Sequence, residues 1–267
     1  MLLRSWISRN CRKGISVQFK AICILSVVLG LNQIDPAQAR EQDALIDKVA
    51  QRQSSQPQKI AVVGDSLAKE LGHGMQRLLR EADDHTVVTF AKPATGLMRD
   101  DVYDWQAALK QFLAKTKLDL IVVMIGGNDR QSIFVDGHRL SRGSPAWRAE
   151  YERRVARFMD ALTTANAKVY WIGLPAVRSA KMTQDYRELN QVFRKQAEKH
   201  KFAYVSTWKD FVDEGGDYSS FGRSLNGVKR RLRKEDGMHF TLDGELLLAH
   251  VVAQAIGLNV NQVRIAR

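Results

Sequence analysis

The chain has 267 residues, of which 45% are apolar and 26% charged, a balance typical of soluble globular proteins rather than disordered or membrane-embedded ones. Its length suits one large α/β domain or two small ones, with a sizeable core. The 41 basic and 29 acidic residues give a net charge of +12, which makes anionic polymers or membrane surfaces candidate partners.

The first 39 residues have the pattern of a secretory signal peptide. Several arginines and lysines precede an apolar run at 21–31, and the small residues Ala37 and Ala39 come directly before Arg40. The alternative is an uncleaved membrane anchor, but the run is shorter than the roughly 20 residues that span a bilayer. We therefore expect cleavage after Ala39, a periplasmic or secreted bacterial protein, and no stable membrane span in the mature chain.

The mature chain would have no cysteine, because Cys11 and Cys23 both lie in the predicted signal peptide. This excludes a thiol nucleophile and thiolate metal ligands. Removing residues 1–39 takes away five of the 41 basic and one of the 29 acidic residues, which leaves 36 minus 28, or +8. An exported basic protein is expected to meet an anionic polymer rather than nucleic acid. The histidines show no metal-ligand spacing, so we predict no metal and no cofactor.

From residue 59 onward, short β-branched runs alternate with amphipathic helical patterns. Residues 40–58 are polar and are expected to form a linker. Strands are expected at 59–63, 86–90, 118–125, 168–174 and 202–206. Helices are expected at 67–81, 102–115, 145–165, 183–199 and 242–256. This alternation predicts a single α/β domain at 59–267, with a five-stranded parallel sheet covered by helices on both faces. Two segments, 130–144 and 207–235, show no interpretable pattern but are expected to shape the pocket.

Ser66 lies between the first predicted strand and the first predicted helix. In open α/β sheets, ligands bind beyond the carboxyl ends of the strands. The free N–H groups at a helix start also favour a developing negative charge. Ser66 is therefore a candidate nucleophile, although Asp65 or Ser66 could instead be only a helix N-cap.

A second candidate, the segment Asp236-Gly-Met-His239, directly precedes the last predicted helix. A carboxylate three residues before a histidine can reach its Nδ1 across a tight turn and leave Nε2 free to accept a proton from a serine. The alternative is a loop histidine that happens to follow an acid.

Acyl transfer also needs hydrogen-bond donors for an oxyanion. Asn128 follows the central predicted strand and offers a side-chain amide, while Gly96 and Ser66 offer backbone N–H groups. Asn128 could instead serve only the turn, and Gly96 could supply a positive φ. An α/β-hydrolase elbow requires a second glycine where this chain has Ala68, and phosphate-binding loops require more glycines than follow this strand.

These motifs together resemble the SGNH/GDSL hydrolase superfamily. Gly64-Asp65-Ser66-Leu67 matches the GDSL signature, Gly126-x-Asn128-Asp129 the GxND block, and Asp236-x-x-His239 the DxxH block, with Gly96 at the second block's glycine. The resemblance runs from about residue 59 to 257 and implies a three-layer α/β/α, flavodoxin-like fold. It implies that Ser66 is the nucleophile, His239 the base and Asp236 its orienting acid. The Ser66 N–H, Gly96 and Asn128 would form the oxyanion hole. The sequence around these motifs further resembles the DUF459-type exported bacterial subgroup.

On this basis we expect an exported serine esterase that hydrolyses short acyl esters through an acyl-enzyme. An O-acetyl group on an envelope polysaccharide or peptidoglycan would be such a substrate. The alternatives are an O-acyltransferase with the same triad and a non-catalytic envelope-binding protein. We expect Arg130 and Asp65 to contact substrate. The basic run at 229–234 either recruits an anionic polymer or is merely solvated.

Overall fold

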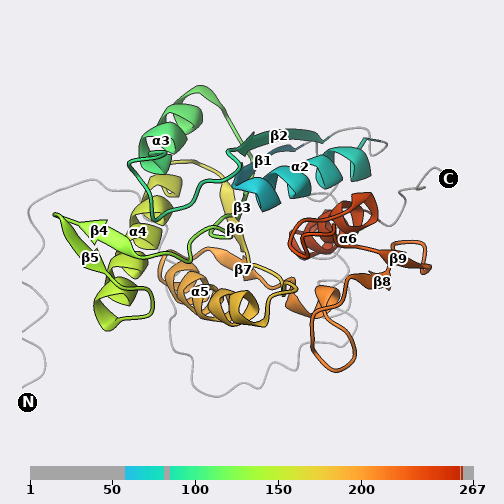
Figure 1. Ribbon diagram of the computed structural model, residues 1–267. Coiled ribbons are helices and arrows are strands. Elements are labelled where there is room, and N and C mark those ends of the chain that lie inside the picture. The colour runs from blue at the N-terminus through green and yellow to red at the C-terminus, as the bar shows by residue number, and fades with distance from the viewer. Residues whose placement is uncertain (1–57, 81–84, 259, 261–267) are drawn as a thin grey trace, which may run out of the picture. The chain divides into compact units, whose positions relative to one another are not determined.

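The computed structural model describes residues 58–80, 85–258 and 260 of the chain, which are coloured in Figure 1. The predicted signal peptide at 1–39 and all but the last residue of the predicted linker at 40–58 lie outside the described residues. Among the described helices, none combines the length and the apolar character needed to cross a bilayer.

Five parallel strands form the central sheet, as predicted. They are β1 (Lys59–Gly64), β2 (Thr86–Ala91), β3 (Leu120–Met124), β6 (Lys168–Ile172) and β7 (Ala203–Val205). Their order is β2-β1-β3-β6-β7. The two central neighbours are paired with Ile60 opposite Leu120 and Val63 opposite Val123. All four of these side chains are buried, because helices cover both faces of the sheet and leave no polar side for a central strand.

Helices pack on both faces of the sheet (Figure 1). They are α2 (Ser66–Leu78), α3 (Trp105–Lys115), α4 (Pro145–Leu162), α5 (Ala180–Lys199) and α6 (Leu242–Ala255). Helix α2 packs along α6, whereas α4 packs against both α3 and α5. This arrangement confirms the predicted three-layer α/β/α fold.

Side-chain caps set the helix starts, which apolar periodicity alone did not locate. The helix expected from 102 begins only at Trp105, because Asp104 accepts a hydrogen bond from the Ala107 N–H. Conversely, the helix expected from 183 begins at 180, where Ser179 caps it through the Met182 N–H.

Both segments without a sequence pattern contain short hairpins. Strands β4 (Ile133–Val135) and β5 (His138–Leu140) pair antiparallel, as do β8 (Phe221–Arg223) and β9 (Lys229–Arg231). A single 3-10 turn, η1 (Trp208–Phe211), follows β7.

Candidate active site

The turn between β1 and α2 places Ser66 at the carboxyl edge of the sheet. Gly64 ends β1 with a φ of +146°, and a Cβ there would lie 2.0 Å from the carbonyl oxygen of Met124 in β3. Only glycine therefore allows the two strands to lie this close at their ends. Asp65 caps the helix, and Ser66 is its first residue.

Three predicted site residues, Ser66, Asp236 and His239, form one hydrogen-bonded chain. The Nε2 atom of His239 lies 2.9 Å from Ser66 Oγ, and its Nδ1 atom lies 2.6 Å from Asp236 Oδ2. The other carboxylate oxygen of Asp236 accepts hydrogen bonds from the N–H groups of Met238 and His239, at 2.8 and 2.9 Å. These contacts fix the turn and the histidine ring together.

Asp236 is ionised at neutral pH. Partial burial raises its pKa, but the hydrogen bonds from the His239 ring and from the N–H groups of Met238 and His239 outweigh this, and the pKa falls to about 2. A carboxylate in this position holds the proton on Nδ1 of His239. The Nε2 atom can then accept the hydroxyl proton of Ser66.

The three predicted oxyanion-hole donors differ in whether they already donate a hydrogen bond within the protein. Among the described residues, the N–H groups of Ser66 and Gly96 donate to no internal acceptor. One hydrogen of the Asn128 amide is used, because Nδ2 lies 2.8 Å from the Thr95 carbonyl oxygen. The second amide hydrogen of Asn128 is left for an oxyanion.

Gly96 is needed for close packing and not for a positive φ. A Cβ at this position would lie 2.0 Å from Oδ1 of Asp129. Asp129 is buried and accepts hydrogen bonds from the N–H groups of Leu97 and Met98 and from the Tyr151 hydroxyl, at 2.9, 3.2 and 3.0 Å. The aspartate of the GxND block therefore anchors the loop that carries Gly96.

The expected substrate contact of Asp65 is wrong. Its side chain is fully buried, and its two oxygens accept hydrogen bonds from the N–H groups of Leu67, Gly126 and Gly127, at 3.0, 3.0 and 2.9 Å. Asp65 thus joins the start of α2 to the loop after β3. Burial raises the pKa of Asp65 to about 7 against the lowering effect of these bonds, and the nearby charge of Asp129 also raises it.

Glu70, which sequence reasoning did not single out, connects the two halves of the site. It lies one turn along α2 from Ser66. Its Oε2 accepts the N–H of Phe240 at 3.0 Å, and its Oε1 lies 2.6 Å from Lys234 Nζ. The Lys234 N–H in turn donates to the His239 carbonyl at 2.7 Å. The helix that begins with Ser66 therefore also holds the segment that carries His239.

The basic run at 229–234 divides into an exposed and a structural half. Arg233 is fully buried, donates to the carbonyls of Met238 and Ala176 at 2.5 and 2.7 Å, and lies 4.0 Å over the Phe240 ring. Burial lowers its pKa to about 10, so the side chain stays charged at neutral pH. Arg233 and Lys234 thus support the catalytic turn, although Lys234 is itself half-exposed, and the three residues of β9 are exposed.

Two arginines border the site. Arg130 lies directly after the GxND block, is about one-third exposed, and has an NH1 atom 3.6 Å from Asp185 Oδ2. Arg178, not predicted from the sequence, is exposed and packs against Gly237, where a Cβ would lie 2.4 Å from its own Cβ. Within the described residues, the Arg178 guanidinium has neither an ion pair nor a hydrogen bond.

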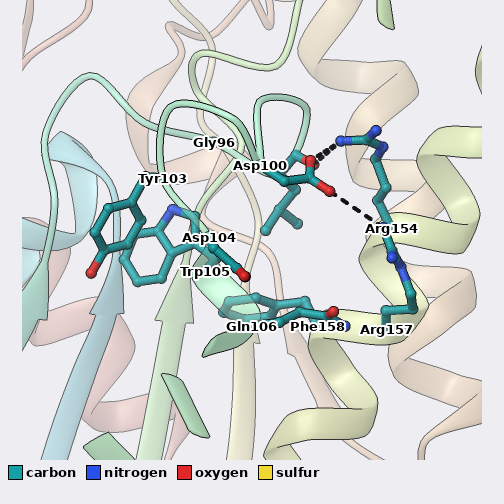
Figure 2. A pocket seen from close by; sticks show the side chains of 10 residues that line it. Gly96, Asp100, Tyr103, Asp104, Trp105, Gln106, Arg154, Arg157 and Phe158 are labelled. Carbon is teal, nitrogen blue, oxygen red and sulfur yellow. Dashed lines mark hydrogen bonds and ion pairs between the residues drawn. The ribbon is translucent and has the colours of Figure 1, made fainter. Parts of the chain in front are cut away.

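A small cavity of about 30 Å³ lies behind the Gly96 loop. Figure 2 shows Asp100 of this loop linked to Arg154 and Arg157 of α4. Arg154 also donates to the Met98 carbonyl at 2.9 Å. The cavity has room for about one water molecule, so the contacts around it hold the loop in place rather than forming a substrate pocket. Elsewhere in the described chain, no three His, Cys, Asp or Glu side chains are grouped as metal ligands.

The sequence model of a family described as "Protein of unknown function (DUF459)" matches residues 59–255. The chain belongs to the DUF459 family. The match extends from β1 to the end of α6 and so includes the Ser66–His239–Asp236 chain. This confirms the finer resemblance seen in the sequence. A search of curated proteins finds no match.

Solved structures share the fold of this DUF459 protein. An acetylxylan esterase from Geobacillus stearothermophilus has a TM-score of 0.53 and 18% identity, over 78% of this chain and 98% of that one. A GDSL-like lipase from Bacteroides thetaiotaomicron has a TM-score of 0.52 and 15% identity, over 82% and 95%. At these identities the likeness concerns the fold, which is the flavodoxin-like fold expected from the SGNH/GDSL resemblance.

Proposed function

We propose that this protein is an exported serine esterase that cleaves short acyl esters through an acyl-enzyme on Ser66. One observation carries the proposal: the hydrogen-bonded chain from Ser66 Oγ through His239 to Asp236, at 2.9 and 2.6 Å. A serine hydroxyl is a weak nucleophile until a base accepts its proton, and this chain supplies the base and orients it.

The reaction would proceed in two halves. Ser66 Oγ attacks the ester carbonyl carbon while its proton passes to His239 Nε2. The N–H groups of Ser66 and Gly96 and the Asn128 amide stabilise the resulting oxyanion, and each such donor is worth about 3–4 kcal/mol. Collapse of the intermediate breaks the ester bond, and the departing alcohol takes the proton from His239. Water then attacks the acyl-Ser66, with His239 again as base, and releases the acid.

The proposed substrate class is supported less directly than the proposed reaction. The signal-peptide pattern indicates the periplasm or the outside of the cell, where O-acylated envelope glycans are one class of accessible ester. One protein of the same fold is an acetylxylan esterase. Arg130 and Arg178 put positive charge beside the site. We therefore favour O-acetyl groups on an envelope polysaccharide or peptidoglycan, and we expect Arg130 to contact the glycan.

The test is hydrolysis of a short-chain chromogenic ester by the wild-type protein and by Ser66→Ala. Chromophore release that disappears in the variant would support the esterase. A fluorophosphonate that labels Ser66 without ester turnover would point to an acyltransferase that lacks its acceptor. A folded wild-type protein with neither turnover nor labelling would instead be a binding protein.

A further inference from the structure

A second concave surface lies away from Ser66, between α5 and β7 with the residues after it. It encloses a cavity of about 480 Å³, which is within the usual size range of small-ligand sites. Basic, aromatic and amide side chains dominate its lining. These are Arg187, Gln191, Arg194, Lys195, Tyr204 and Trp208.

Two arginines in this groove are held by aromatic rings. The guanidinium carbon of Arg187 lies 4.8 Å from the centre of the Trp208 ring, and that of Arg194 lies 5.0 Å from the centre of the Tyr204 ring. A guanidinium stacked on a ring keeps its N–H groups at its edge, where they can bind a carboxylate with two parallel hydrogen bonds. These cation–π contacts restrict both side chains before a ligand arrives.

The positive charge of these arginines is not neutralised locally. Across the residues that the structure describes, neither Arg187 nor Arg194 lies within ion-pair distance of a carboxylate, although Glu198 is part of the lining. Lys195 differs, because its Nζ atom lies 3.0 Å from Glu152. The groove therefore offers two positioned guanidinium groups to an anionic ligand.

The wall of the groove is closely packed and adjoins the catalytic edge of the sheet. Asn190 of α5 uses both ends of its amide on the backbone of Leu174, at 2.8 Å each. Tyr204 packs so tightly on Gly173, just after β6, that a Cβ there would lie 2.2 Å from the tyrosine hydroxyl. The same helix reaches the Ser66 site through Tyr186, whose hydroxyl donates to the Gly127 carbonyl at 2.8 Å.

We propose that this groove is a second binding site, which holds a carboxylated oligosaccharide segment. The two stacked guanidiniums would bind sugar carboxylates, and Gln191 and the aromatic side chains would contact the sugar hydroxyls and rings. The volume of the cavity, about 480 Å³, is enough for a few sugar units. The inference goes beyond esterase activity, because it concerns binding of the acid groups of a glycan and does not depend on Ser66 as a nucleophile.

The test measures binding of a short oligogalacturonate to the full chain carrying Ser66→Ala, by calorimetry. The fully methyl-esterified oligomer is the neutral comparison. We expect the acid form to bind and the neutral form to bind at least tenfold more weakly. Replacing both Arg187 and Arg194 with glutamine should weaken binding of the acid form by roughly tenfold or more, because charged hydrogen bonds are lost.

A matched double variant, Lys229→Gln with Arg230→Gln, removes the same charge from the exposed β9 strand. It should bind like the parent. Chemical shifts of the Trp208 indole should also move when the acid form is added to the parent protein, which tests the groove without an arginine variant. The proposal is overturned if nothing binds, if both oligomers bind equally, or if only the β9 variant loses affinity. Ester turnover by the chain that keeps Ser66 and carries only Arg187→Gln and Arg194→Gln should equal that of the wild type, which separates this result from that of the esterase test.

Discussion

The two halves of the active site are held in place by different means. Ser66 sits on a turn whose position follows from the packed core: β1 is buried, Gly64 closes on β3, and Asp65 binds three backbone N–H groups. His239 sits in an irregular segment held by polar side chains, chiefly Glu70 and Arg233. The nucleophile is therefore fixed by the fold itself, whereas the base depends on a few long-range contacts.

The largest effect is expected when either the nucleophile or its base is removed. Ser66→Ala and His239→Ala should each lower kcat/KM for a short ester by roughly 10⁴-fold or more. Ser66 is a weak nucleophile without His239, and His239 has no hydroxyl proton to accept without Ser66. The double variant should be no worse than either single variant. Steady-state kinetics of the three proteins measures this, and multiplicative losses would show that the residues act independently.

Gly96→Ala tests the oxyanion loop on the serine side. The new methyl group would lie 2.0 Å from Asp129 Oδ1, so the loop must shift and its N–H must leave the oxyanion position. We expect kcat to fall by roughly 10²–10³-fold. Gly215→Ala is the matched control, since a Cβ there meets one atom at 3.3 Å. Equal kinetics for the two variants would remove Gly96 from the oxyanion hole.

Glu70→Gln tests the support of the histidine side. Glutamine can still accept the Phe240 N–H but loses the charge that binds Lys234. We expect kcat and the rate of Ser66 labelling by a fluorophosphonate to fall about tenfold, with a stability loss of about 1–2 kcal/mol. Glu152→Gln removes a similar ion pair, with Lys195, away from the site. If both variants label Ser66 at the wild-type rate, Glu70 does not position His239.

The acid groups of the two halves should respond oppositely to pH. Burial raises the pKa of Asp129 to about 6, above its unfolded value of about 3.9. Its contribution to stability is full below pH about 4 and is lost as the pH rises through about 6. The lowered pKa of Asp236 gives stability above pH about 4 that is lost as the pH falls through about 2.

Chemical denaturation across this pH range measures both slopes. Asp129→Asn should reduce the decline between pH about 4 and 6, and Asp236→Asn should reduce the decline below pH about 4. An unchanged pH dependence in Asp129→Asn would contradict the raised pKa.

The smallest effect concerns the arginines at the rim. Arg130→Gln and Arg178→Gln should leave kcat for a neutral ester unchanged and raise KM only for an acylated anionic glycan, by about three- to tenfold, as for the loss of a partly exposed charged contact. Kinetics with both substrates measures this, and a KM change for the neutral ester would point to a general effect on the fold.

The same contrast explains how much the sequence could predict. Ser66, Gly96, Asn128 and His239 were found because each belongs to a local motif beside a strand end or helix start. Glu70 was missed because its partner Lys234 lies 164 residues away, and no local pattern links such a pair. The basic run likewise gave no sign that Arg233 is buried, because the rings of Phe211, Tyr218 and Phe240 surround it only once the irregular segment has folded.

Some missed features did leave a local signal. The β4–β5 hairpin turns at Asp136-Gly137, and both residues have positive φ, as a type I′ turn requires. An Asp-Gly pair directly after the apolar run Ile133–Val135 could have predicted it. The role of Asp65 could not be predicted in this way. Its carboxylate meets the N–H groups of Gly126 and Gly127, in the loop after β3, only once the sheet has formed.

The central claim is that His239 makes Ser66 a nucleophile that becomes acylated. The most direct measurement is intact-protein and peptide mass spectrometry after rapid acid quenching of the reaction with a short chromogenic ester. The account predicts a transient acyl group on the peptide that contains Ser66, strongly reduced in His239→Ala and absent in Ser66→Ala. Ester turnover by a wild-type protein that never carries the acyl group, and that persists in Ser66→Ala, would contradict it.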